Sequence, residues 1–234
     1  MIAECLTAQL DRELLHWFNN SHSLFVDGVA FSLTQGYTWI PLYVALLYIV
    51  VRNNETMAQI ALAVACVGGA VLFADAVTDG LVKPWVGRWR PSNDPIWKYT
   101  IDIVNNVRGD KYSFFSAHAA NTMTVATFMS LMVRSGRFAL FMICWSLLNA
   151  WTRLYLGLHY PSDIAVGLVW GMCTGAVAYY FYYRIYRKIS SPLHYISSKY
   201  TVTGYSLDDL DVVYLVMSLT VFYALFRAVL FPFS

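Results

Sequence analysis

Residues 57–82 read MAQIALAVACVGGAVLFADAVTDGLV, and this stretch determines which class of protein the chain can be. Its only charged residues are Asp75 and Asp79, close to its end. A helix needs about 20 mainly apolar residues to cross the hydrocarbon core of a bilayer, and this stretch exceeds that length. We therefore predict a transmembrane helix here and an integral membrane protein.

Five more apolar stretches along the chain have the same character. Together with residues 57–82, the predicted spans are 37–51, 117–133, 138–154, 163–183 and 212–230. The composition agrees, because 58% of the 234 residues are hydrophobic and 13% are charged, whereas soluble domains carry about 25% charged residues. We predict an all-α helical bundle with about six transmembrane helices, formed by one domain over residues 1–234.

The N-terminal segment, residues 1–36, is predicted to include an amphipathic helix that lies in the membrane interface before the first span. Apolar residues recur there at helical spacing, opposite polar ones. These residues are Leu6, Leu10, Leu14, Trp17 and Phe18.

Charge and cysteine content exclude several classes of partner. The formal net charge of +2 and the lack of a basic tail give no sign of nucleic-acid binding. The four cysteines occur singly, without CxxC spacing or histidine neighbours at metal-ligand spacing. We predict neither a metal nor a cofactor, and no protein partner is indicated.

The first polar cluster, residues 83–91, reads KPWVGRWRP directly after a predicted span. Lys83, Arg88 and Arg90 place three cations within eight residues, which suits an anion. The alternative is an interfacial stop sequence, whose tryptophans join the aromatic belt and whose cations meet lipid head groups. Asp75 and Asp79 precede Lys83 at spacings of four, so all three share a helical face, where the aspartates either line a wet helix end or pair with cations.

The second cluster, Ser116-Ala117-His118, opens a predicted span. Ser116 is a natural N-cap, and the unpaired amides and positive dipole end of a helix start attract an anion. His118 lies just inside this helix, where it could donate a proton to a leaving oxygen. A purely structural histidine is the alternative.

The third cluster runs from Arg153 to Asp163 between two predicted spans. Pro161 suits the first turn of a new helix, and His159 lies four residues before Asp163. A carboxylate bonded to one imidazole nitrogen leaves the other nitrogen free to attack as a nucleophile. Alternatively, Asp163 only caps the helix and His159 packs at the interface.

With six spans, the loops at 83–116 and 155–162 emerge on the same side of the membrane, because two spans separate them. All three clusters therefore lie on one face. The opposite side carries cations in short loops, which tend to stay cytoplasmic, so the clusters are predicted on the outer face. These cations are Arg52, Arg134, Arg137, Arg184, Arg187, Lys188 and Lys199.

The three clusters together resemble the type 2 phosphatidic acid phosphatase superfamily, whose motifs are Lys-x6-Arg-Pro, Pro-Ser-Gly-His and Ser-Arg-x5-His-x3-Asp. The matching residues are Lys83, Arg90, Pro91, Ser116, His118, Arg153, His159 and Asp163. The chain departs from the motifs at Phe115, Ala117 and Thr152. None of these departures removes a titrating group, and Ala117 can still present its amide if its dihedral angles are helical.

The resemblance implies a metal-independent lipid phosphatase. His159 would attack phosphorus, Asp163 would orient His159, and His118 would protonate the leaving oxygen. The phosphate would be held by Lys83, Arg90, Ser116, the amide of Ala117 and Arg153. The family acts on phosphatidic acid, phosphatidylglycerol phosphate, polyprenyl pyrophosphates and lipid A phosphates, and the site would lie on the periplasmic face of a bacterial inner membrane.

The aromatic and cationic loop after residue 83 favours a bulky, multiply anionic head group, as in lipid A or an undecaprenyl carrier. Two other functions stay open on the residues alone. In a metal-dependent lipid phosphotransferase, Asp75 and Asp79 would hold magnesium. In a transporter, the intramembrane charges would form an ion path.

Overall fold

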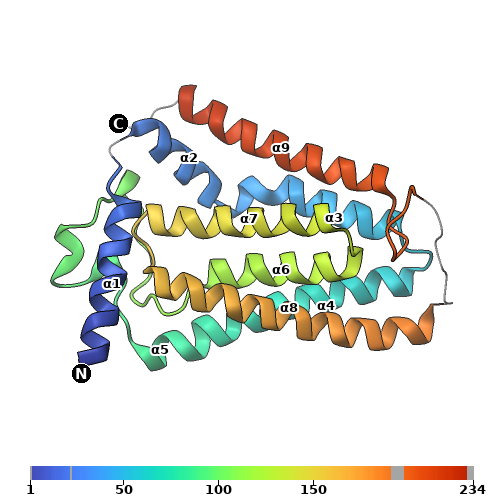
Figure 1. Ribbon diagram of the computed structural model, residues 1–234, viewed down its shortest axis with the longest axis horizontal. Helices are drawn as coiled ribbons and strands as arrows, with labels where there is room; N and C mark the ends of the chain where they lie inside the picture. Colours follow the sequence, from blue (N-terminus) through green and yellow to red (C-terminus); the bar gives the residue numbers. More distant parts are fainter. Residues whose placement is uncertain (1, 22, 191–197, 231–234) are drawn as a thin grey trace.

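The computed structural model describes residues 2–21, 23–190 and 198–230, and it confirms the all-α prediction (Figure 1). Long helices run roughly along the longest axis of the molecule, and one helix lies across their end. The main helices are α1 (Ile2–Asn19), α2 (Leu24–Thr34), α3 (Ile40–Arg52), α4 (Met57–Asp75), α5 (Lys83–Val86), α6 (Ala117–Val133), α7 (Gly136–Tyr155), α8 (Pro161–Ile189) and α9 (Leu207–Leu230).

Each of the six predicted spans coincides with a helix in the structure. Three helical stretches are long and apolar enough by themselves to cross a membrane: Met57–Val86, Pro161–Ile189 and Leu207–Leu230, with mean hydropathies of 2.3, 1.6 and 1.9. A fourth candidate is the bent pair formed by α2 and residues Gly36–Arg52. Helices α6 and α7 run beside these spans but do not meet the same test of length and composition.

The predicted N-terminal segment 1–36 divides into two helices. Helix α2 packs on α7 and α9 and meets α3 at an angle of 71°. Pro41 lies in the first turn of α3, where its missing N–H costs no hydrogen bond. Thr38 Oγ1 and Trp39 Nε1 donate to the carbonyls of Ser32 and Leu33 at 2.6 and 2.8 Å, so side chains at the bend satisfy the end of α2.

Helix α6 is the centre of the bundle and packs against α4, α7 and α8. Its contact with α8 is close because Gly167, Gly171 and Gly175 face its backbone. A Cβ atom on Gly167 would lie 2.7 Å from the Ser116 carbonyl oxygen, and one on Gly171 would strike the Ala120 carbonyl. Small residues at four-residue spacing are what allow membrane helices to approach this closely.

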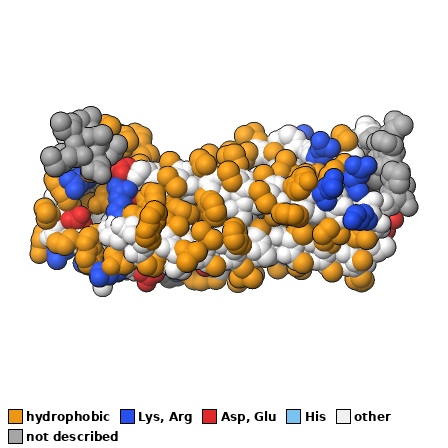
Figure 2. Space-filling model, turned by 90° about the horizontal axis from the view of Figure 1, so that it is seen from below, with side chains coloured by type: hydrophobic (Ala, Val, Ile, Leu, Met, Phe, Trp, Pro, Cys, Tyr) orange, Lys and Arg blue, Asp and Glu red, His pale blue; other side chains and the backbone are white. Residues whose placement is uncertain are grey.

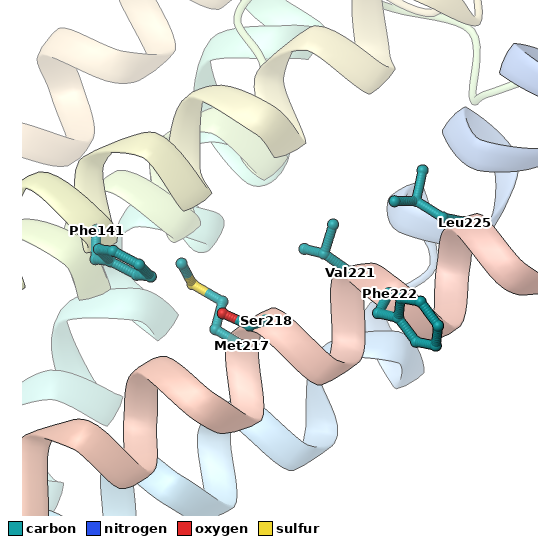
Figure 3. Close-up of a pocket in the computed structure, with 6 residues that line it drawn as sticks. All are labelled: Phe141, Met217, Ser218, Val221, Phe222 and Leu225. Atoms are coloured by element: carbon teal, nitrogen blue, oxygen red, sulfur yellow. The ribbon is translucent and has the colours of Figure 1, made fainter.

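The surface is divided between an apolar middle and two charged ends (Figure 2). Large apolar side chains of α4, α8 and α9, such as Leu72, Val169 and Phe222 (Figure 3), are more than half exposed, which in water would be unfavourable but in lipid is not. In the view of Figure 2, lysine and arginine side chains gather toward both ends. This distribution fits a bundle that spans a bilayer.

Helix α1 lies across the end of the bundle, as predicted for an interfacial helix (Figure 1). Leu10, Leu14 and Trp17 are exposed on one side, whereas Asp11 and Leu15 are buried against the protein. Helix α1 contacts α7 and α8. It therefore covers the end at which α6 and α8 begin.

Candidate active site

The three polar clusters meet at the end of the bundle covered by α1. Helices α6 and α8 both begin there and pack side by side, and the amide of Ser116 donates to the carbonyl of Asp163 at 3.1 Å. His118 is close enough to Arg153, His159, Lys83 and Arg90 for their charges to act on it. Residues from all three motifs thus form one site.

Arg90 contacts His159 directly. Arg90 Nη1 lies 3.1 Å from His159 Nε2 and donates to the Leu158 carbonyl at 3.2 Å. A guanidinium has only donors, so Nε2 must accept and the ring proton of a neutral His159 must lie on Nδ1. The lone pair of Nε2 is therefore directed at the Arg90 guanidinium, which could donate to a phosphate instead.

Asp163 faces the other side of the His159 ring. Its Oδ2 lies 3.7 Å from His159 Nδ1, which exceeds hydrogen-bonding distance, so the predicted hydrogen bond is not formed in this structure. The carboxylate is held elsewhere: Oδ2 accepts from the amide of Tyr160 at 3.0 Å and Oδ1 accepts from Arg88 at 2.8 Å. A small movement of the His159 ring would close the gap to Oδ2.

His159 is neutral in this environment because it is fully buried among cations. Burial lowers its pKa to about 3, with Arg90 and Arg153 contributing to this shift and Asp163 opposing it. Burial also lowers the pKa of Arg90, although Asp110, Asp79 and Asp163 counteract this. The site therefore presents a neutral imidazole beside positive charge.

The buried guanidinium groups of this cluster lack the partners that such groups normally have. Across residues 2–21, 23–190 and 198–230, neither Arg90 nor Arg153 forms an ion pair, and the Nε atoms of both have no hydrogen-bond partner. Arg153 donates from Nη1 to Thr34 Oγ1 at 2.8 Å. Buried charges are usually paired, so these two cations leave room for an anion.

Lys83 differs, because it is already paired within its own helix. Its Nζ lies 2.5 Å from Asp79 Oδ1, and Lys83 is buried whereas Asp79 is half-exposed. The pair spans a π-helix, Ala76–Val82, in which the amide of Lys83 bonds to the carbonyl of Thr78. Such wider turns are frequent at functional sites. The pairing of Asp79 with a cation was one of the two predicted alternatives.

The start of α6 has the predicted form. Ser116 is the N-cap, and its hydroxyl accepts from the amide of Ala119 at 3.4 Å. Ala117 is the first helical residue and does not have a positive φ, so the departure from glycine causes no strain. The amides of Ala117 and His118 have no carbonyl one turn back within the helix, and the His118 side chain is exposed.

Two residues that sequence reasoning did not assign to the site, Asp11 and Ser162, belong to it together with Arg88. Arg88 donates to Asp163 Oδ1 and Ser162 Oγ at 2.8 Å and to Asp11 Oδ2 at 2.6 Å. Asp11 Oδ1 also accepts from the amide of Ser162 at 2.9 Å. Helix α1 is therefore tied to Asp163 through Arg88. The sequence offered one signal that Arg88 belongs to the site, namely its position two residues before Arg90.

An antiparallel bridge between Trp89 and Tyr112 joins the two arms of the loop that carries both arginines. Residues two apart in an extended segment project to the same side, which explains why Arg88 and Arg90 both reach the start of α8. Gly109 lies over Arg90, where a Cβ atom would come within 2.6 Å of Cζ. The loop thus closes over the guanidinium.

The other cations of this loop have contacts within the loop. Arg108 donates to the Ser92 carbonyl at 3.2 Å. Lys98 lies 5.0 Å from the centre of the Tyr99 ring, and Lys111 lies 4.9 Å from that of Trp89. These groups hold the loop together.

Comparison with known proteins agrees with this geometry. The PAP2 superfamily model matches residues 59–187. The chain is 35% identical over 186 residues to the lipid A 4'-phosphatase of Bacteroides thetaiotaomicron, covering 79% of this chain and 82% of that protein. The chain belongs to the PAP2 superfamily.

Two further comparisons extend this result. The chain is 29% identical over 180 residues to the lipid A 4'-phosphatase of Porphyromonas gingivalis, covering 76% of this chain and 73% of that protein. The crystal structure of Aquifex aeolicus LpxE aligns with a TM-score of 0.52 and 19% identity over 72% of this chain and 94% of that chain, which is a likeness of fold. As a PAP2 member with these relatives, the protein is a membrane phosphatase that acts on a lipid phosphate.

Proposed function

We propose that the protein removes a phosphate from the head group of lipid A, through a phosphohistidine on His159 and without a metal ion. The observation that carries the proposal is the pair of buried guanidinium groups, Arg90 and Arg153, that lack ion pairs beside the Nε2 lone pair of His159. Two relatives with the name lipid A 4'-phosphatase support the choice of substrate.

The phosphate would lie between Arg90, Arg153 and the start of α6. Planar guanidinium groups can each bind two phosphate oxygens, and the first amides of α6 add donors at the positive end of the helix dipole. Lys83 would contribute its charge while it remains bonded to Asp79. Such a cradle stabilises the charge on phosphorus during transfer.

In the first step, His159 Nε2 forms a bond to phosphorus while the bond from phosphorus to the lipid oxygen breaks. Protonated His118 gives its proton to that oxygen, and the phosphate dianion offsets the cations around His118 that would otherwise disfavour this form. Asp163 stabilises the positive charge that develops on His159. In the second step, water attacks phosphorus while the bond from phosphorus to His159 Nε2 breaks. His118 takes a proton from that water, and inorganic phosphate leaves.

The two carboxylates that a metal-dependent mechanism would use have other partners here. Asp75 accepts from Asn121 at 2.8 Å, and Asp79 pairs with Lys83. A transporter would need no nucleophile, yet the site places a neutral imidazole against a cation. Both observations favour the phosphohistidine mechanism over its rivals.

We place the site on the outer face of the bacterial inner membrane. The support is the charge of the opposite end, where short connections carry Arg52, Arg134 and Arg137, because cationic loops tend to remain cytoplasmic. The reactivity of cysteines introduced at each end of the bundle, measured from one face of oriented vesicles, would test this placement.

The test of the function uses purified protein in EDTA and a panel of lipids: lipid A, undecaprenyl pyrophosphate, phosphatidylglycerol phosphate and phosphatidic acid. We expect phosphate release, highest on lipid A, and none from His159→Ala. Release that stops in EDTA would contradict the metal-free mechanism. Equal release by parent and His159→Ala would contradict the role of His159.

A further inference from the structure

A cavity of about 1010 Å³ opens next to the site, between α1 and the loop at residues 97–101. Tyr160, which directly follows His159, forms part of its wall. In Figure 1, α1 lies between the bundle and the loop region that contains residues 97–101. The cavity therefore reaches the residue next to His159. The rest of its lining comes from residues 9–20 and 97–101, outside the motifs of residues 83–91, 116–118 and 153–163.

The wall of this cavity combines aromatic faces with neutral hydrogen-bonding groups. Trp97 and Tyr160 contribute rings, and Gln9, Asn20 and Thr100 contribute amide and hydroxyl groups. A ligand pocket typically has an apolar lining with a few polar groups that fix orientation. A sugar ring has the complementary chemistry, because its C–H faces pack on aromatic rings while its hydroxyls form hydrogen bonds.

The charge of the cavity differs from that of the phosphate cradle. Arg12 lies over the Trp97 ring, 4.3 Å from its centre, and Glu13 accepts from Gln9 Nε2 at 2.9 Å. One cation and one carboxylate therefore offset each other, whereas the cradle contains two unpaired guanidinium groups. This balance suits a neutral saccharide better than a second phosphate.

The position of the cavity also suits the head group of an amphiphile. Leu10 and Leu14 are exposed on α1 and would face lipid, while Trp17 and the polar residues Gln9, Arg12 and Glu13 of the same helix line the cavity. Acyl chains could therefore stay in the bilayer while a head group lies between α1 and the loop. Tyr160 would separate the sugar from the phosphate by the width of one side chain.

We propose that this cavity is a saccharide subsite, which binds the sugar of a glycolipid phosphate while the phosphate lies against Arg90 and His159. Trp97, held by Arg12, is its stacking platform. The inference rests on the proposed function, since it takes the phosphorylated lipid as substrate, and it adds that selectivity comes from the sugar.

Trp97→Ala tests the subsite with two substrates that differ in the sugar. The protein is assayed in a detergent without a sugar head group, since alkyl glycosides would compete. We expect kcat/KM on lipid A to fall about tenfold through KM, and kcat/KM on phosphatidic acid to stay unchanged. The matched control is Trp85→Ala, because Trp85 is 86% exposed and does not line the cavity. An equal fall on both lipids, or no fall on either, would overturn the proposal.

A binding measurement separates this inference from the proposed function. His159→Ala in nanodiscs is titrated with glucosyl diacylglycerol, which has a sugar and no phosphate, and with diacylglycerol. We expect the glycolipid to bind more tightly, and a second change, Trp97→Ala, to remove the difference. Equal binding of both lipids would refute the subsite even if phosphate release is observed. Sugar-dependent binding by this variant, together with no phosphate release by the parent protein, would instead refute the proposed function alone.

Discussion

The site contains two layers of charge that differ in how their members are paired. In the inner layer, Arg90, which is buried beside His159, and Arg153, which is partly buried, form no ion pairs among the described residues. In the outer layer, Arg88 is bonded to both Asp163 and Asp11. Arg88 and Arg90 are two residues apart in the same extended segment, so their local sequence does not explain the difference.

The comparison shows how pairing separates binding from positioning. An unpaired buried cation destabilises the free protein, because it loses hydration without compensation, and it persists where a ligand supplies the missing charge. A cation that is paired with carboxylates stabilises the fold and holds the neighbouring side chains in position. We therefore expect substitutions in the two layers to change stability in opposite directions, although both reduce activity.

The largest effect is expected from His159→Ala, which removes the nucleophile. Phosphate release should fall to background, and no phosphohistidine should form when the protein is denatured during turnover with labelled substrate. Asn substitution at this position is the matched control for volume and should be equally inactive. Detectable covalent phosphate in either variant would place the nucleophile elsewhere.

Arg153→Lys should lose most turnover, by about 100-fold, because lysine keeps the charge but not the planar fork that binds two oxygens. Arg153→Met sharpens the contrast between the layers, since it removes an unpaired buried charge. We expect this variant to be inactive and to have a higher Tm than the parent. A lower Tm for Arg153→Met, or near-normal turnover of Arg153→Lys, would contradict the assignment to the inner layer.

In the outer layer, Asp11→Asn should reduce kcat by about tenfold and leave KM nearly unchanged, since Asp11 positions Asp163 through Arg88 without reaching the phosphate. Its Tm should fall, because Arg88 loses one of its two carboxylate partners. The control is Glu13→Gln, two residues further along α1 and outside this network, for which we expect parental kcat on phosphatidic acid. A change in KM alone would show that Asp11 contacts substrate.

The sequence predicted the elements of this site better than their connections. The spans, the Ser116 cap, the helix start at Pro161 and the meeting of the three motifs all follow from local signals: apolar length, capping residues and fixed spacing. The structure has a helix at each predicted span, and it bears out the Ser116 cap and the helix start at Pro161. Three of these helices, and a fourth as part of a bent pair, are long and apolar enough to cross a membrane.

Other features depend on contacts between distant residues and had no local signal. The pairing of Asp11 with Arg88 joins residues 77 positions apart, and the cavity under α1 exists only once the loop at 97–101 is placed. The bend before α3 was missed because Gln35 and Gly36 interrupt the apolar run, so that α2 does not look like part of a span. The glycines at 167, 171 and 175 did carry a signal, their four-residue spacing, which predicts close helix packing.

The smallest expected effect is on the pH dependence of stability. Burial lowers the pKa of His159 to about 3, whereas an unfolded histidine has a pKa of about 6.5. As the pH falls below 6.5, His159 therefore binds a proton in the unfolded state but not in the folded state. This residue then lowers the free energy of unfolding by about 1.4 kcal/mol per pH unit. Above about pH 7.5 the contribution is constant.

His159→Gln should lack this slope, so its Tm should decrease less than that of the parent between pH 7 and pH 5. Bound phosphate or vanadate should reduce the difference, because an anion between Arg90 and His159 favours the protonated ring and fills the inner layer. The measurement is Tm against pH for both proteins, with and without the anion. Parallel curves for parent and variant would show that His159 titrates normally, and the inner layer would then be less enclosed than the contacts of Arg90 indicate.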